Sequence, residues 1–370
     1  MIQLSIFRKK EDKLKEEGSY RQGKIQDLPY SGNGRYTPLL DKLTTEKAIE
    51  VVRETFVTQL EKRMNLMKVT APLAVEEGTG INDDLGGGEK PVTFHTKNYD
   101  LKGSIVQSLA KWKRLRLADL TMEPGGGIWT DMKALRPDDI LSPIHSVYVD
   151  QWDWEKCILP HQRTPSYLRS QVEHIYEALK KTEATVCGLY PSINPLLPEK
   201  IKFIHSQELL DEYPNLPPAE REKAAARKYG AIFITGIGHT LKNGLPHDKR
   251  APDYDDWSTA CEGEHRGLNG DIILWNPVTG SAFEISSMGI RVDKKALIRQ
   301  LDLSGCPERK SLAFHKMLLE DKLPLSAGGG IGQSRICMFM LRKAHIGEVQ
   351  AGIWPADIRE ECRGKGIELI

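Results

Sequence analysis

The chain has 370 residues, of which 39% are hydrophobic and 28% charged, an ordinary composition for a globular protein with a sizeable core. Lysine and arginine number 52 and aspartate and glutamate 51, so the formal net charge is only +1. A nucleic-acid-binding domain normally carries a strong basic excess, so the composition does not favour a nucleic acid partner.

The cysteines and the N-terminal residues bear on the cellular compartment. The spacing between the six cysteines excludes a zinc ribbon and a disulfide framework, and reduced thiols are the simplest interpretation. No apolar run approaches the length of a membrane span, and the first residues match neither a signal nor a transit peptide. We therefore expect a cytoplasmic protein with no membrane partner. The six cysteines, none in a Cys-x-x-Cys pair, are Cys157, Cys187, Cys261, Cys306, Cys337 and Cys362.

Two regions are predicted at the start of the chain. Residues 1–37 are polar and weakly periodic, which indicates an appended N-terminal arm, and 38–370 form a single domain. Within 43–66 an apolar residue recurs at every fourth position, which predicts an amphipathic helix. Residues 68–73 then form a short extended segment, in which Pro72 excludes a central strand position. The residues of the helical stripe are Val52, Phe56, Leu60 and Met64.

The middle and the end of the chain alternate between strand and helix patterns. Residues 277–280 contain a proline and a glycine between two strand patterns and predict a hairpin turn. Strands joined by hairpins, with helices set apart from them, predict an α+β fold around an antiparallel sheet. The predicted strands are 146–155, 231–236, 271–278 and 281–292, and the predicted helices are 166–183, 219–228, 293–303, 308–320 and 333–343.

The strand 146–155 has an unusual polar face. Gln151 and Asp153 are two residues apart and therefore point to the same side, where Val147 and Val149 precede them. A carboxylate beside an amide can hold an ammonium group and a carbonyl oxygen. An exposed sheet face is the plain alternative, but the change from apolar to polar along one face favours a pocket.

Two further segments carry dense charge. Residues 250–257, RAPDYDDW, combine Arg250 and Asp255 with aromatic neighbours, and a solvated acidic loop explains them equally well. Asp271 and Glu284 lie on the two strands of the predicted hairpin. If those strands pair, the two carboxylates approach each other and can share Mg²⁺, which one or two carboxylates and substrate phosphates typically bind.

Residues 328–343, GGGIGQSRICMFMLRK, place glycines before a buried helix with Arg335 in its first turn. Glycines let a backbone approach a ligand closely, and a free guanidinium suits a nucleotide. The pattern is neither a Walker loop nor a GxGxxG fingerprint. It matches the third signature of class II aminoacyl-tRNA synthetases, whose arginine binds ATP. A plain strand, turn and helix with a surface arginine is the alternative.

Taken together, these segments resemble the ammonia-dependent asparagine synthetases, the A-type aspartate–ammonia ligase family. The similarity extends from about residue 40 to residue 358, in several composite segments in the same order. They are SLAKWKR (108–114), ALRPDD (134–139), HSVYVDQWDWE (145–155), RAPDYDDWST (250–259), LNGDI (268–272), FEISSMGIRV (283–292) and GGGIGQSR (328–335).

The resemblance implies a homodimer with a class II aminoacyl-tRNA synthetase-like antiparallel sheet flanked by helices. It implies that 38–370 is the catalytic domain and that L-aspartate, ATP and ammonia give L-asparagine, AMP and pyrophosphate through β-aspartyl-adenylate. The helix 43–66 stands in the place of the family's dimer-forming motif, although it could equally be a core helix. Two features depart from the family: residues 1–37 and the last dozen residues have no counterpart, and Val149 stands where class II synthetases carry an aromatic residue on adenine.

The resemblance also implies roles for individual residues around the reacting phosphate. Arg136 would hold the α-phosphate and the β-carboxylate of aspartate, and Arg335 would pack on adenine or bind the outer phosphates. Asp83, in GTGINDDLGGG (78–88), would face the amide side of the product and attract ammonium. Gln151 with Arg136 would stabilise the tetrahedral oxyanion.

The remaining implied roles concern substrate, nucleotide and metal. Asp153 would bind the α-amino group of aspartate. Asp271 and Glu284 would bind Mg²⁺ and, through it, ATP. The residues implied for the α-carboxylate are Ser108, Lys113 and Arg291, with Ser286 and Ser287 also at the aspartate site, and Arg250 and Asp255 would lie near the nucleotide.

Three other protein classes are weaker matches. A glutamine-dependent asparagine synthetase needs a nucleophilic cysteine after the initiator methionine, and Ile2 stands there. An aminoacyl-tRNA synthetase shares the adenylation core, but the N-terminal arm is too short for a typical anticodon-binding domain. A catalytically inactive relative would not need to retain Asp83, Arg136, Gln151 and Arg335.

Overall fold

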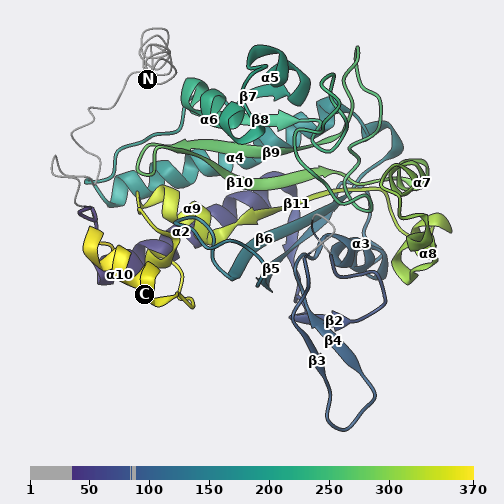
Figure 1. Ribbon diagram of the computed structural model, residues 1–370, viewed down its shortest axis with the longest axis horizontal. Coiled ribbons are helices and arrows are strands. Elements are labelled where there is room, and N and C mark those ends of the chain that lie inside the picture. Colours follow the sequence, from purple (N-terminus) through teal and green to yellow (C-terminus); the bar gives the residue numbers. More distant parts are fainter. Residues whose placement is uncertain (1–35, 84, 86–88) are drawn as a thin grey trace, which may run out of the picture.

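An eight-stranded mixed sheet forms the centre of the computed structural model, which describes residues 36–83, 85 and 89–370 (Figure 1). The six central strands pair with one another in antiparallel fashion, and each outermost strand pairs in parallel with the next. This confirms the predicted α+β fold. In spatial order the strands are β1 (Leu66–Lys68), β5 (Gly127–Leu135), β6 (Tyr148–Cys157), β11 (Ser326–Gly332), β10 (Ser281–Ile290), β9 (Asn269–Asn276), β8 (Ala231–Thr235) and β7 (Lys202–His205).

The predicted strands and their hairpin are confirmed, with small shifts at their ends. β9 and β10 are joined by the turn 277–280, in which Gly280 adopts a left-handed φ of 61°. The predicted helix 308–320 is wrong in one respect, because it is two short elements. Leu312 has extended backbone angles (φ −69°, ψ 151°) and separates the 3₁₀ helix η3 (Pro307–Ser311) from α8 (Ala313–Leu319).

One face of the sheet is covered by three helices that bury the main core: α2 (Lys42–Met64), α4 (Pro165–Leu189) and α9 (Gln333–Met340). Asp41 caps α2 by accepting a hydrogen bond from the Thr44 N–H at 2.8 Å. The four residues of the predicted apolar stripe are all fully buried, which confirms this helix. They pack against sheet residues that include Trp152 and Trp154.

The other elements surround this framework. A small antiparallel sheet of β2 (Ala74–Glu76), β4 (Lys102–Ile105) and β3 (Thr93–His95) projects from the body beside α3 (Figure 1). None of the helices in the described part of the chain has both the length and the apolar character that crossing a bilayer requires. The remaining helices are α3 (Ala110–Asp119), η2 (Pro160–Gln162), α5 (Ser206–Glu212), α6 (Pro218–Tyr229), α7 (Lys294–Leu303), η4 (Ile346–Glu348) and α10 (Ala356–Lys365).

The predicted N-terminal arm, 1–37, lies outside the described residues except for its last two. Tyr36 is 2% exposed, and its hydroxyl donates to Glu348 Oε2 at 2.8 Å. Its side chain packs with Cys362 and Ile367 at the C-terminal end. The last dozen residues therefore hold the start of the described chain against the body.

Replacing Phe56 with alanine tests the packing of α2 on the sheet. The ring is fully buried, and its centroid lies 4.6 Å from that of Trp152. We expect Phe56→Ala to lower the free energy of unfolding by about 3–5 kcal/mol, because it leaves a cavity in the core. Denaturant-induced unfolding measures this, and Thr58→Ala on the exposed side of α2 is the control. Equal losses in the two variants would contradict the described orientation of the helix.

Candidate active site

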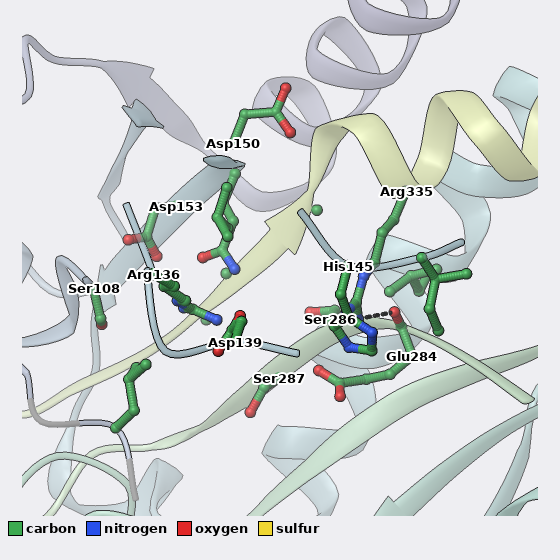
Figure 2. A pocket seen from close by; sticks show the side chains of 18 of the residues that line it. Ser108, Arg136, Asp139, His145, Asp150, Asp153, Glu284, Ser286, Ser287 and Arg335 are labelled. Atoms are coloured by element: carbon green, nitrogen blue, oxygen red, sulfur yellow. Dashed lines mark hydrogen bonds between the residues drawn. The ribbon is translucent and has the colours of Figure 1, made fainter. Parts of the chain in front are cut away.

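A cavity of about 990 Å³ opens on the sheet face opposite the main core, between the loop after β5 and the segment before β9 (Figure 2). All predicted site residues except Asp83, Lys113 and Asp271 line it. The structure thus brings together residues that lie more than 200 positions apart in the sequence. The lining residues from the prediction are Ser108, Arg136, Gln151, Asp153, Arg250, Asp255, Glu284, Ser286, Ser287, Arg291 and Arg335.

The strand register explains how the floor of the cavity is built. Asp153 of β6 lies opposite Gly330 of β11, Gly330 lies opposite Ser287 of β10, and Ser287 lies opposite Asp271 of β9. Directly paired residues point to the same face, so these four positions form one row across the sheet. Gly330 leaves room for a neighbouring side chain, because a Cβ there would lie 2.1 Å from Gln151 Oε1.

Four arginines line this cavity, and two of them, Arg136 and Arg335, are each oriented by a backbone carbonyl. Arg136 follows β5, and its Nη2 donates to the Gln107 carbonyl at 3.0 Å. Arg335 lies in the first turn of α9 and donates through Nη1 to the Glu284 carbonyl at 2.7 Å, the dashed line in Figure 2. Burial lowers the pKa of Arg335; the negative charge of Glu284 opposes this shift, and the positive charge of Arg136 adds to it. Two cations that influence each other in this way are suited to a polyanion such as a phosphate chain.

Asp271 and Glu284 lie on the same side of the β9–β10 pair, as predicted for a shared cation. Burial raises the pKa of Asp271, and the neighbouring charge of Glu284 contributes to the rise. Arg250 donates to Asp271 Oδ2, while Asp271 Oδ1 is buried and finds no hydrogen-bond partner among the described residues. Within the described residues no group of three His, Cys, Asp or Glu side chains gathers as a metal cage. The donor set therefore fits Mg²⁺ that takes its other ligands from substrate phosphates and water.

Lys113 lies behind the cavity wall. Its ammonium is fully buried and donates to Asp153 Oδ1, to the Trp154 carbonyl at 2.9 Å and to the Gly329 carbonyl at 3.2 Å. Glu155 Oε2 lies 3.8 Å away. Burial lowers the pKa of Lys113, and the two carboxylates oppose that shift. Lys113 therefore fixes Asp153 from below, whereas the resemblance implied direct contact with substrate.

Arg291 also lies within a buried ion network. Its Nε and Nη2 donate to Glu155 at 2.8–3.1 Å, and its Nη1 donates to Asp255 Oδ1. Glu155 is fully buried and was absent from the predicted site residues. Its place on the same strand face as Gln151 and Asp153 was the signal that could have identified it. Asp255 is thus tied to the cavity floor, which excludes the solvated-loop interpretation for this residue.

Asp83 lies beside the cavity, behind one of its lining residues. It is 3% exposed, and its Oδ1 accepts from the Leu85 N–H at 3.2 Å. Tyr254 lines the cavity, and burial together with the charge of Asp83 holds the pKa of Tyr254 well above its usual value. Tyr254 was also missed, because an aromatic residue inside an acidic segment gives no separate sequence signal.

His145 is a further lining residue that the prediction omitted. Its Nδ1 lies 2.8 Å from Ser142 Oγ, and backbone hydrogen bonds join the same two residues in both directions. Burial lowers the pKa of His145, and the charge of Arg335 adds to the effect. The ring lies near Arg335 at the wall of the cavity (Figure 2). Val149 is also a lining residue.

Known proteins resemble this chain over nearly its whole length. A sequence profile described as aspartate-ammonia ligase matches residues 43–366. The chain belongs to the aspartate–ammonia ligase family. An aspartate–ammonia ligase of Parabacteroides distasonis is 53% identical over 336 residues, which cover 90% of this chain and 97% of the relative. A ligase of the same name from Clostridium perfringens is 51% identical over the same shares of the two chains.

Solved structures of class II aminoacyl-tRNA synthetases share the fold of this ligase-family chain. The asparaginyl-tRNA synthetase of Entamoeba histolytica in complex with asparaginyl-adenylate superimposes with a TM-score of 0.61 at 13% identity, covering 84% of this chain and 66% of the synthetase. The enzyme from Pyrococcus horikoshii, also complexed with asparaginyl-adenylate, gives 0.55 at 15% identity, covering 84% and 70%. These likenesses confirm the predicted class II synthetase-like sheet.

Removing the charge of Lys113 tests the buried network. We expect Lys113→Met to lower the free energy of unfolding by about 3–5 kcal/mol, because Asp153 and Glu155 would remain buried beside an uncharged side chain. Lys365→Met removes an exposed ion pair with Glu361 and serves as the control, with an expected loss below about 1 kcal/mol. Urea denaturation of both variants gives the comparison. A loss for Lys113→Met no larger than that of the control would rule out the proposed support of Asp153.

Proposed function

We propose that this chain synthesises L-asparagine from L-aspartate, ATP and ammonia through β-aspartyl-adenylate, with release of AMP and pyrophosphate. One observation supports the residue-level proposal above all others: Arg136, Arg335 and the acidic side chain of Glu284 line one cavity above the Gln151–Asp153 row. Family membership supports the reaction. The arrangement supports the residue roles, because it would place positively charged groups around the α-phosphorus that a carboxylate oxygen of aspartate attacks.

Adenylation requires little covalent work from the protein. A carboxylate oxygen of the aspartate side chain attacks the α-phosphorus, and the bond to the pyrophosphate oxygen breaks. Negative charge accumulates on the phosphoryl oxygens as this happens, so positioned cations provide most of the rate. Arg136 holds the α-phosphate and the attacking carboxylate, and Arg335 binds the adenine or the outer phosphates. Arg250 and Asp255 form the adjoining part of the nucleotide site.

Asp271 and Glu284 would hold Mg²⁺, and the phosphate oxygens of ATP together with water would supply its other ligands. The ion, when bound, neutralises phosphate charge and orients the leaving pyrophosphate. The unpartnered Oδ1 of Asp271 supports this assignment. Arg250 donates to the other oxygen of Asp271 and thereby restricts the orientation of that carboxylate.

The aspartate substrate fits the polar row of the sheet. Asp153 accepts from the α-amino group, while Ser108 and Arg291 face the α-carboxylate. Lys113 acts from behind by fixing the Asp153 carboxylate. Ser286 and Ser287 of β10 complete this part of the wall. The Ser286 hydroxyl is buried and has no hydrogen-bond partner within the part of the chain that the structure describes.

Ammonia enters the second half-reaction, and it arrives largely as ammonium. Asp83 attracts the cation and accepts one proton, so that the nitrogen lone pair can attack the β-carbonyl carbon. A tetrahedral oxyanion forms, which Gln151 and Arg136 stabilise by hydrogen bonds. The C–O bond to AMP then breaks, and the nitrogen loses a second proton to give the neutral amide of asparagine.

We extend the proposal to the oligomeric state, the cellular compartment and the domain organisation of the chain. A homodimer would use α2 and the adjoining β1, which lies at one edge of the main sheet. Residues 1–37 would form an appended arm, and 38–370 the catalytic domain. The protein would act in the cytoplasm, without a nucleic acid or membrane partner.

A single assay separates this function from tRNA charging. We expect the purified chain to convert aspartate, ATP and ammonium chloride into asparagine and AMP in equal amounts without added tRNA. Chromatographic quantification of asparagine and AMP checks the stoichiometry. Omitting Mg²⁺ with a chelator should abolish both products. A parallel reaction contains added tRNA. Formation of aminoacylated tRNA there, with no free asparagine in either reaction, would show that the proposed reaction is wrong.

Asp83→Asn should separate the two half-reactions. The amide cannot accept a proton from ammonium, so we expect asparagine formation to fall by about a hundredfold or more while aspartate-dependent ATP–pyrophosphate exchange stays near the wild-type rate. Asp119→Asn, at an exposed carboxylate of α3, is the control. Equal losses in both half-reactions would mean that Asp83 does not handle ammonia.

A further inference from the structure

Asp150 lines the cavity, as do Ser334 and Gln350, but its carboxylate is directed to the other side of the sheet. It separates Val149 from Gln151 on β6, so its side chain leaves the strand on the face that carries Trp152. Figure 2 shows the Asp150 carboxylate directed away from Arg136 and toward a helix. The residue is 5% exposed. A carboxylate on the core face of a strand is costly unless other groups satisfy it.

The first turn of α9 satisfies this carboxylate. Asp150 Oδ1 accepts from the Ser334 backbone N–H at 3.0 Å, and Oδ2 accepts from the Ser334 hydroxyl at 2.7 Å. The N-cap of α9 is Gly332, which has no side chain to accept from the free N–H groups of the first turn. Asp150 therefore supplies from β6 the cap that the helix lacks in its own sequence, and its charge complements the helix dipole.

Two more contacts fix the same carboxylate. Gln350 donates to Asp150 Oδ1 at 3.3 Å and to the Ser334 hydroxyl at 3.0 Å. Arg53 of α2 donates to Asp150 Oδ2 at 3.1 Å. The adjoining Gln333 is held in a similar way, because its amide donates to Asp131 Oδ1 of β5 at 2.7 Å. Both residues before Arg335 are thus anchored to the sheet by carboxylates.

We propose that Asp150 is a positioning residue for nucleotide binding, acting through Ser334 to aim Arg335 into the cavity. Arg335 follows Ser334 directly, and its guanidinium crosses to the carbonyl of Glu284 on β10. A first turn that frays or rotates would move this long side chain away from the phosphates or the base. The inference rests on the proposed function, in that Arg335 is taken to contact ATP.

Asp150→Asn is the direct test. The Asn side chain keeps one acceptor oxygen, but it has no charge and places an NH2 group where Asp150 Oδ2 accepts from the Ser334 hydroxyl and from Arg53, so these two charge-assisted hydrogen bonds are lost. We expect the KM for ATP in pyrophosphate exchange to rise about tenfold, while the KM for aspartate stays within about twofold. Glu183→Gln is the matched control, because Glu183 is 3% exposed and accepts from the Leu196 N–H at 2.8 Å, outside the cavity lining. It should lower the Tm without changing the KM for ATP.

Ser334→Ala provides a milder variant that keeps the backbone N–H contact. We expect a smaller rise in the KM for ATP, and the double variant with Asp150→Asn should be no worse than Asp150→Asn alone, because both act through one contact. If Asp150→Asn fails to fold, Ser334→Ala decides the question. An unchanged KM for ATP in the folded variants, or equal rises for ATP and aspartate, would overturn the proposal.

Equilibrium dialysis with labelled ATP measures ATP binding directly, so it tests the positioning role of Asp150 independently of the proposed reaction. Weaker ATP binding by Asp150→Asn, in a protein whose wild type makes no asparagine, would uphold the positioning role and reject the reaction. If instead Asp150→Asn binds ATP as tightly as the wild type does, and the wild type makes asparagine, the reaction is upheld and the positioning role is rejected.

Discussion

The site depends on a row of buried side chains, alternately negative and positive, that lies beneath the floor of the cavity. Lys113 lies between Asp153 and Glu155, and Arg291 lies between Glu155 and Asp255. These five side chains are at most 3% exposed, and a buried charge without a partner costs several kcal/mol. Each ion is therefore held in place by the next, and Asp153 is oriented before any substrate arrives. Such preorganisation is what electrostatic catalysis requires.

Glycines in β11 make this arrangement possible. A Cβ on Gly328 would lie 1.9 Å from Glu155 Oε2, just as one on Gly330 would meet Gln151. The side chains of Gln151 and Glu155 on β6 therefore lie over β11, in the space that side chains at positions 330 and 328 would fill. The glycine run was expected to admit a ligand close to the backbone. In the structure its first effect is to admit the protein's own polar groups, of which Gln151 faces the cavity and Glu155 is buried beneath it.

The two faces of β6 divide the work between stability and chemistry. Trp152 and Trp154 pack into the main core, and Gln151 and Asp153 face the cavity. Asp150 is a polar residue on the core face, and α9 satisfies it. The strand thereby connects the core helices to Arg335, so the placement of one cavity arginine depends on groups that lie on the opposite side of the sheet.

The sequence alone determined the α+β class, the hairpin and a set of site residues most of which line the cavity, because strand periodicity and family motifs are local patterns. It misjudged the helix 308–320, which Leu312 divides, and it could not foresee that Lys113 lies behind Asp153 or that Glu155 holds Arg291. Those pairs are separated by 40 and 136 residues in the chain. Only the tertiary structure decides whether such a charged group meets water, substrate or another ion, since burial and partners come from distant segments.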